Sequence, residues 1–241
     1  MNNLRIVLVA TSHPGNIGAA ARAMKNMGLH RLYLVTPKHF PDSRANEMAA
    51  GADDVLEHAV ITDSLAEAVS DCHWVFATSA RAREMALPGH LPETCAQKIA
   101  HAPLGTEIAI VFGREHAGLT NEELARCHYH VHIPSNPMFS SLNLAQSVQI
   151  LAYELRMKNM SPEHNVMTHQ PILATIEDVE RFHAHLADTL ISLDFIHITH
   201  PKRLLQRLRR LFNRVQLEAL EVNLLRGILT QIQRMCVTKK S

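Results

Sequence analysis

The chain has 241 residues and a net charge of +1, and 46% of the residues are hydrophobic and 20% are charged, which is ordinary for a globular protein. This composition excludes a disordered or uniformly basic chain, and no apolar run is long enough to cross a bilayer. The N-terminus lacks the basic and apolar regions of a secretory signal, so we expect a cytoplasmic protein with no membrane partner.

The first part of the chain alternates apolar runs of strand length with amphipathic stretches. This alternation predicts an α/β fold with a mainly parallel sheet, because parallel strands need crossover connections, which are usually helices. We assign residues 1–157 to this domain. The runs that predict strands are RIVLVA at 5–10, RLYLV at 31–35, HWVFATS at 73–79, EIAIVFG at 107–113 and YHVHIP at 129–134.

The first strand leads into the loop TSHPGNIGAAARAMKNMG, residues 11–28. Pro14, Gly15 and Gly18 permit a tight turn. Asn16 can cap the helix that follows, and Arg22 projects from the first turns of that helix. The glycine spacing lacks the G-x-G of a dinucleotide-binding loop, so a nicotinamide-dependent enzyme is disfavoured. Taken alone, Arg22 is explained as a solvent-facing arginine.

A second glycine-containing loop, VFGREHAGLTNEEL, follows the strand at 107–113 and opens a helix capped by Thr120 or Asn121. From Gly113 it has the Walker A spacing, but Leu119 stands where the phosphate-binding lysine would be, so a nucleoside triphosphatase is disfavoured. Gly113 would let a ligand approach the backbone, and Gly118 can adopt the positive φ of a turn.

Histidines cluster in the next strand, where His128, His130 and His132 share one face. We expect no metal site there, because no carboxylate or cysteine pattern converges on them. The four cysteines are scattered without a C-x-x-C pair, which argues against a disulfide framework and a zinc ribbon.

The third loop reads IPSNPMFSSLNLAQS and passes into an apolar helix, predicted at 139–156. Ser140, Ser141 and Asn143 crowd the start of this helix, where their side chains can accept hydrogen bonds from free backbone N–H groups. Each of the three loops has a structural explanation by itself. Capping is a poor explanation for all three together, and in an open α/β sheet ligands bind beyond the carboxyl ends of the strands.

The C-terminal part has a different pattern. Residues 158–172 are polar and interrupted by proline, which predicts a linker, and residues 173–241 form a small helical domain. Residues 201–241 contain ten basic and two acidic residues, a local charge of +8 that leaves −7 for the rest of the chain. Such a basic segment favours an anionic partner such as RNA, although a solvated helix face explains it equally well.

The three loops together resemble the three motifs of the SPOUT methyltransferases, in the branch that methylates ribose 2′-hydroxyls of RNA. The matching patterns are N-x-G-x-x-x-R, V-F-G-R-E-x-x-G-L and I-P-x-x-x-x-x-S-S-L-N-L-A, and they cover about residues 4–156. With its C-terminal extension, the whole chain is similar to bacterial enzymes that use S-adenosylmethionine to methylate a cytidine or uridine at position 32 of the tRNA anticodon loop.

This resemblance implies a deep trefoil knot over about 108–156, although knots are rare in proteins. It also implies a homodimer whose active sites are each built from both subunits, with the C-terminal helices serving RNA binding or dimerisation. Two alternatives remain open, which are ribose methylation of ribosomal RNA by the same fold and a non-catalytic RNA-binding dimer.

The resemblance also assigns roles to residues. Arg22 and Ser141 are the expected catalytic residues. Because a guanidinium with a pKa above about 12 is a poor base, we expect Arg22 to bind the target phosphate and stabilise the developing alkoxide, with Ser141 orienting the hydroxyl. Asn16, Glu115 and Asn143 are expected to support the loops, and Arg83 and Arg114 to contact phosphate. The expected cofactor contacts are Thr78, Ser79, Ala80, Gly113, Ile133, Ser140, Ser141 and Leu142.

Overall fold

The computed structural model describes residues 2–79, 87–160, 172–196 and 202–239, in two compact units, Met1–His169 and Gln170–Ser241. Ala80 and Arg83, which the sequence assigns to cofactor and phosphate contacts, lie outside the described residues. So does most of the predicted linker, and its boundaries therefore stay a prediction. Within the described parts of the chain, no helix is both long and apolar enough to span a membrane.

The first unit is built on a seven-stranded sheet in which every pair of neighbouring strands is parallel. The predicted α/β fold with a parallel sheet is therefore confirmed. Along the sheet the strands are β3 Val60–Thr62, β2 Arg31–Val35, β1 Leu4–Val9, β6 Ile108–Phe112, β4 Trp74–Thr78, β7 Tyr129–Val131 and β5 Gly89–His90. Two short strands, β3 and β5, were not predicted, because neither carries a buried apolar run.

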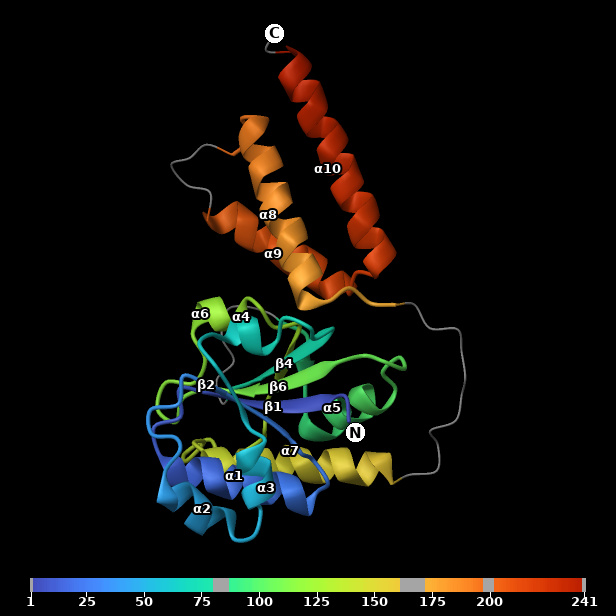
Figure 1. Ribbon diagram of the computed structural model, residues 1–241. Helices are drawn as coiled ribbons and strands as arrows, with labels where there is room; N and C mark the ends of the chain where they lie inside the picture. The colour runs from blue at the N-terminus through green and yellow to red at the C-terminus, as the bar shows by residue number, and fades with distance from the viewer. Residues whose placement is uncertain (1, 80–86, 161–171, 197–201, 240–241) are drawn as a thin grey trace. The chain divides into compact units, whose positions relative to one another are not determined.

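Helices cover both faces of this sheet, as Figure 1 shows. In that view α1, α2, α3 and α7 lie below the sheet, and α4 and α6 lie above it. Covering on both faces explains why all six residues of β1 are buried, as is usual for a central parallel strand. The helices are α1 Pro14–Asn26, α2 Ser43–Ala49, α3 Asp53–Glu57, α4 Leu65–Ala68, α5 Pro92–Ala100, α6 Asn121–Leu124 and α7 Leu144–Asn159.

The glycines of the first loop have a different role from the one predicted. Helix α1 already begins at Pro14, so Gly15 and Gly18 are helical and the predicted tight turn is wrong. A Cβ atom on Gly18 would lie 1.9 Å from the carbonyl oxygen of Ala45, so glycine at this position lets α1 pack directly on α2. The predicted cap is also wrong, because His13 is the N-cap residue and α1 has no side-chain cap.

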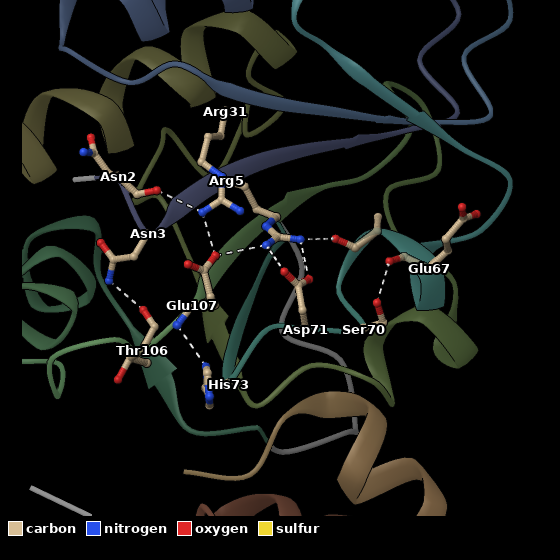
Figure 2. Close-up of polar contacts among 11 residues, drawn as sticks. Asn2, Asn3, Arg5, Arg31, Glu67, Ser70, Asp71, His73, Thr106 and Glu107 are labelled. Atoms are coloured by element: carbon tan, nitrogen blue, oxygen red, sulfur yellow. Dashed lines mark hydrogen bonds and ion pairs between the residues drawn. The ribbon is translucent and has the colours of Figure 1, made fainter. Parts of the chain in front are cut away.

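A buried arginine joins several strands at the amino-terminal end of the sheet (Figure 2). The Arg5 side chain is 1% exposed, and it donates two hydrogen bonds to Asp71, of 2.7 and 2.6 Å, and one of 3.0 Å to Glu107. Arg31 donates to the same Glu107 at 2.6 Å. The Arg5 hydrogen bond lowers the pKa of Asp71. Because a buried charge must be paired, this cluster is a structural requirement of the fold.

In the part of the second unit that the structure describes there are three helices, α8 Ile176–Ser192, α9 Lys202–Val215 and α10 Ala219–Lys239, which confirms the predicted helical C-terminal region. Its core is formed by apolar side chains of α8 and α10 together with Leu217, and Phe212 of α9 packs edge-on against Phe182. Arg209 of α9 forms a two-pronged ion pair with Glu180 of α8, one bond of which measures 2.9 Å. This pair ties α9 to α8.

Candidate active site

A pocket of about 200 Å³ lies at the carboxyl ends of β4, β6 and β7. These three strands are neighbours in the sheet, so the loops that follow them converge on one place. The residues that line the pocket are Thr78, Ser79, Phe112, Gly113, Arg114, Glu115, His116, Ala117, Gly118, Val131, Ile133, Ser140, Ser141, Leu142, Leu144 and Ser147.

Seven of the eight cofactor residues expected from the sequence line this pocket, and the eighth, Ala80, lies outside the described residues. The structure adds apolar wall residues to which the sequence assigned no role, namely Phe112, Val131 and Leu144. All three are buried at the ends of β6 and β7 and at the start of α7. In the sequence they look like ordinary core positions, although Phe112 and Leu144 stand inside the second and third motifs, which is the signal that could have indicated this role.

The pocket walls combine apolar surface with unused main-chain groups. Among the described residues, the main-chain groups of Ile133, Ser141 and Leu142 form no hydrogen bond within the protein. Such groups are fixed by the fold and can recognise the edge of a purine, while the apolar side chains contact its faces. The donor set therefore fits a nucleoside-containing cofactor such as S-adenosylmethionine.

The Walker-like loop is held closed by its own backbone. Arg114 and Gly118 exchange main-chain hydrogen bonds of 3.2 and 2.9 Å, and Gly118 has the predicted positive φ, 67°. A Cβ atom on Gly113 would lie 2.2 Å from the carbonyl carbon of Gly118. The glycine at 113 is thus required for the loop to fold, and Leu119, at the lysine position, is buried in the core.

Arg114 lines the pocket but is already paired. Its guanidinium donates two hydrogen bonds to the carboxylate of Glu123, at 2.9 and 3.0 Å. Glu123 also accepts from the main chain of Thr120, which confirms Thr120 as the cap of α6. A phosphate contact by Arg114 would have to compete with this ion pair.

Glu115 connects the second loop to the first. Its carboxylate accepts hydrogen bonds from the main chain of Ser12 and His13 and from the side chain of Asn16, at 3.1–3.3 Å. Partial burial raises the pKa of Glu115, but these bonds and one from its own main chain outweigh that effect and lower the pKa to about 2. The carboxylate thus supplies the negative charge that α1 lacks in its first turn.

Asn143 extends this connection to the third loop. The side-chain NH2 group of Asn143 donates to the side-chain oxygen of Asn16 at 3.0 Å. The side-chain oxygen of Asn143 caps α7 by accepting from the main-chain N–H groups of Ala145 and Gln146. Helix α7 therefore starts at Leu144, five residues later than predicted. The chain Glu115–Asn16–Asn143 joins the three motif loops through side chains.

Arg22 does not line the pocket, within the described residues of one chain. It is exposed on α1, six residues and therefore about 9 Å along the helix from Asn16. The two expected catalytic residues, Arg22 and Ser141, are thus not brought to one pocket wall by a single subunit.

The histidines predicted to share one strand face, at 128–132, make contacts within the fold. His128 is buried, its Nδ1 accepts a hydrogen bond of 3.1 Å from the main chain of Val75, and burial lowers its pKa to about 4. Within the residues that the structure describes, no three potential ligands among His, Cys, Asp and Glu come together as a metal site would require.

Comparison with known proteins covers both units. Residues 3–153 match the SpoU rRNA Methylase family, and residues 177–241 match the tRNA methyltransferase TrmJ, C-terminal domain. The chain is 49% identical to the tRNA (cytidine/uridine-2'-O-)-methyltransferase TrmJ of Pectobacterium atrosepticum, over 97% of this chain and 98% of that protein.

Solved structures agree with this assignment. The crystal structure of TrmJ from Z. mobilis ZM4 has a TM-score of 0.84 and 36% identity, and the match covers 95% of this chain and 98% of that one. The SpoU methyltransferase AviRb from Streptomyces viridochromogenes, solved in complex with AdoMet, has a TM-score of 0.53 over 66% of this chain and 59% of its own. At 21% identity, that likeness shows the fold alone.

Proposed function

Because this chain belongs to the SpoU rRNA Methylase family and carries a TrmJ C-terminal domain, we propose that it transfers a methyl group from S-adenosylmethionine to a ribose 2′-hydroxyl of tRNA. The target is a cytidine or uridine, in agreement with the name of the relative that matches the chain over nearly its full length. The observation that carries the proposal is the convergence of the second and third motif loops on one pocket, with the first motif loop joined to both through Asn16, which binds Glu115 and Asn143.

The pocket residues hold the cofactor. Main-chain groups of Ile133, Ser141 and Leu142 bind its polar edges, and the apolar walls contact the faces of the adenine. When bound, S-adenosylmethionine supplies a methyl group on a positively charged sulfur that a ribose oxygen can attack. Thr78, Ser79, Gly113 and Ser140 complete the contact set, and Ala80 is assigned to it from the sequence.

Two residues act on the RNA. Ser141 orients the ribose hydroxyl toward the methyl group, so that the reactants meet in line. Arg22 binds the target phosphate with paired N–H donors and stabilises the negative charge that develops on the attacking oxygen.

The protein acts as a homodimer in which Arg22 of one subunit serves the pocket of the other. The exposure of Arg22, and its absence from the pocket wall among the described residues of one chain, support this arrangement. Helix α7 offers an apolar surface for a second copy, since Tyr153 and Met157 are about half exposed. We assign a trefoil knot to residues 108–156 on the family resemblance.

The tRNA target is nucleotide 32 of the anticodon loop, and the basic helices of the C-terminal unit bind the RNA backbone. We assign the protein to the cytoplasm, where tRNA is modified. A second candidate is ribose methylation of ribosomal RNA, in agreement with the name of the matched family.

The test is to incubate the protein with isotope-labelled S-adenosylmethionine and either unmodified tRNA or ribosomal RNA, and to map the label to a nucleotide. We expect 2′-O-methylcytidine or 2′-O-methyluridine at position 32 of tRNA. Label in ribosomal RNA alone would replace the tRNA assignment. Tight RNA binding without any transfer would identify a non-catalytic RNA-binding dimer instead.

A further inference from the structure

Two large apolar side chains point into solvent beside the pocket. Met138 is 92% exposed and Phe139 is 80% exposed, and they directly precede Ser140 and Ser141, which line the pocket. Two consecutive exposed apolar side chains form an apolar patch, and a patch of this kind beside a binding site indicates contact with a ligand.

The turn that carries these side chains is held by specific hydrogen bonds. The side-chain oxygen of Asn136 accepts a hydrogen bond of 3.0 Å from the main-chain N–H of Met138. The main-chain carbonyl of Asn136 accepts one of 2.9 Å from the main-chain N–H of Phe139. The Ser135 hydroxyl donates to the carbonyl of Ser140 at 3.0 Å. Pro134 and Pro137 restrict the backbone further. The exposed position of Phe139 is therefore built into the turn.

We propose that Phe139 stacks on a base of the RNA substrate, next to the ribose that is methylated, and that Met138 contacts the edge of this stack. The inference rests on the proposed function. Nucleotides in single-stranded RNA loops are recognised by stacking on aromatic side chains, and stacking reads the face of a base rather than its hydrogen-bonding edge. A stacking contact is compatible with both cytidine and uridine, the pair named for the TrmJ relative.

The location of the turn favours RNA as the occupant. Ser141, only two residues after Phe139, lines the cofactor pocket, so a side chain at 139 lies within reach of the nucleotide whose hydroxyl faces that pocket. The exposed apolar surface comprises two consecutive side chains, which matches one base better than a protein interface.

The test compares Phe139→Ala and Phe139→Trp with the unchanged protein. The control is Leu104→Ala, because Leu104 is 91% exposed and lies in the loop that precedes β6, at the other end of the strands. Four quantities are measured: kcat and KM for tRNA substrates with cytidine or uridine at the target position, the Kd for S-adenosylmethionine, and the mass in solution.

We expect Phe139→Ala to lower kcat/KM about tenfold to a hundredfold for both pyrimidines, mainly through KM, since one base stack contributes roughly that factor. Phe139→Trp should retain most of the activity, and RNA should quench its new indole emission. Cofactor affinity, mass and the Leu104→Ala control should be unchanged.

Normal kinetics of Phe139→Ala would overturn the proposal. Weaker cofactor binding would reassign Phe139 to the methyl donor, and a lower mass would reassign it to a subunit interface, so either result also contradicts it. The absence of transfer by the unchanged protein would instead be a failure of the proposed function.

Discussion

At the scale of single residues, Glu115 connects the loop that follows β6 to the loop that follows β1. Its carboxylate faces the main chain of Ser12 and His13 and the side chain of Asn16. Glu115→Gln keeps the size but removes the charge, so donors that faced a carboxylate face a neutral amide. We expect a loss of stability of about 1–2 kcal/mol and weaker cofactor binding, measured by thermal unfolding and by calorimetric titration.

The pH dependence of this effect is a sharper measurement. The pKa of Glu115 falls from 4.5 to about 2 on folding, so the folded state favours the carboxylate. The stabilisation is complete above about pH 4.5 and is lost as the pH falls toward 2. The difference in melting temperature between the unchanged protein and Glu115→Gln should therefore shrink from pH 6 to pH 3. A constant difference would mean that the charge of Glu115 contributes nothing.

The substitution Arg22→Lys tests the role proposed for Arg22. It is exposed on α1, so Arg22→Lys should leave the fold and the cofactor affinity unchanged. A lysine keeps the charge but loses the planar pair of donors, and we expect turnover to fall at least about tenfold. Arg181→Lys is the matched control, because Arg181 is exposed on α8 and pairs with Asp178 of its own helix. Near-normal turnover of Arg22→Lys would rule out the need for a bidentate contact.

At the scale of elements, the packing of α1 on α2 depends on a glycine. A methyl group on Gly18 would meet the backbone of Ala45 at 1.9 Å, whereas one on Gly15 would meet only the side chain of Met48 at 3.4 Å. Gly18→Ala must therefore push α1 away from α2, and we expect a loss of about 1–3 kcal/mol, or several degrees in melting temperature.

Gly15→Ala is the control for this prediction, since it introduces the same methyl group into the same helix. Alanine favours helix more than glycine does, so its melting temperature should be unchanged or slightly higher. Equal losses for the two variants would show that helix packing at Gly18 is not the cause.

Most strand positions and the cap of α6 were predictable because they depend on near neighbours. Five of the seven strands follow from apolar runs, and Thr120 caps α6 within the tetrapeptide that carries its capping box. The role of Gly18 was not predictable, because it depends on Ala45, a residue that folding brings to α1 from another helix.

At the scale of the whole molecule, positive charge is concentrated in the C-terminal unit. Arg209 and Arg210 of α9 belong to the basic segment 201–241, which favours an RNA partner. The structure separates them, because Arg209 is paired with Glu180 of α8. Removing Arg209 would disturb the helix pair as well as the charge, so Arg207, which is exposed, is a better choice to combine with Arg210.

We expect the double variant Arg207→Ala and Arg210→Ala to weaken tRNA binding and to reduce the slope of log affinity against log salt by about 1.4–1.8, if both side chains contact phosphate. Binding titrations at several salt concentrations measure this slope. Arg209→Ala should mainly lower the melting temperature. An unchanged slope in the double variant would exclude phosphate contacts by these arginines.

The sequence by itself determined the parallel α/β class and the helical C-terminal region, and its resemblance to the SPOUT methyltransferases indicated seven residues of the pocket wall. Periodicity, turn signals and motif spacing involve residues that are near one another in the sequence, so they can be recognised without knowledge of the fold. Only the tertiary structure decided that Glu115 binds Asn16, 99 residues away, and that Asn143 binds the same Asn16 across 127 residues. It also paired Arg5 with Asp71 and, among the described residues of one chain, left Arg22 outside the pocket lining. Such partners are selected by packing between distant segments, where burial requires each charge and polar group to be satisfied.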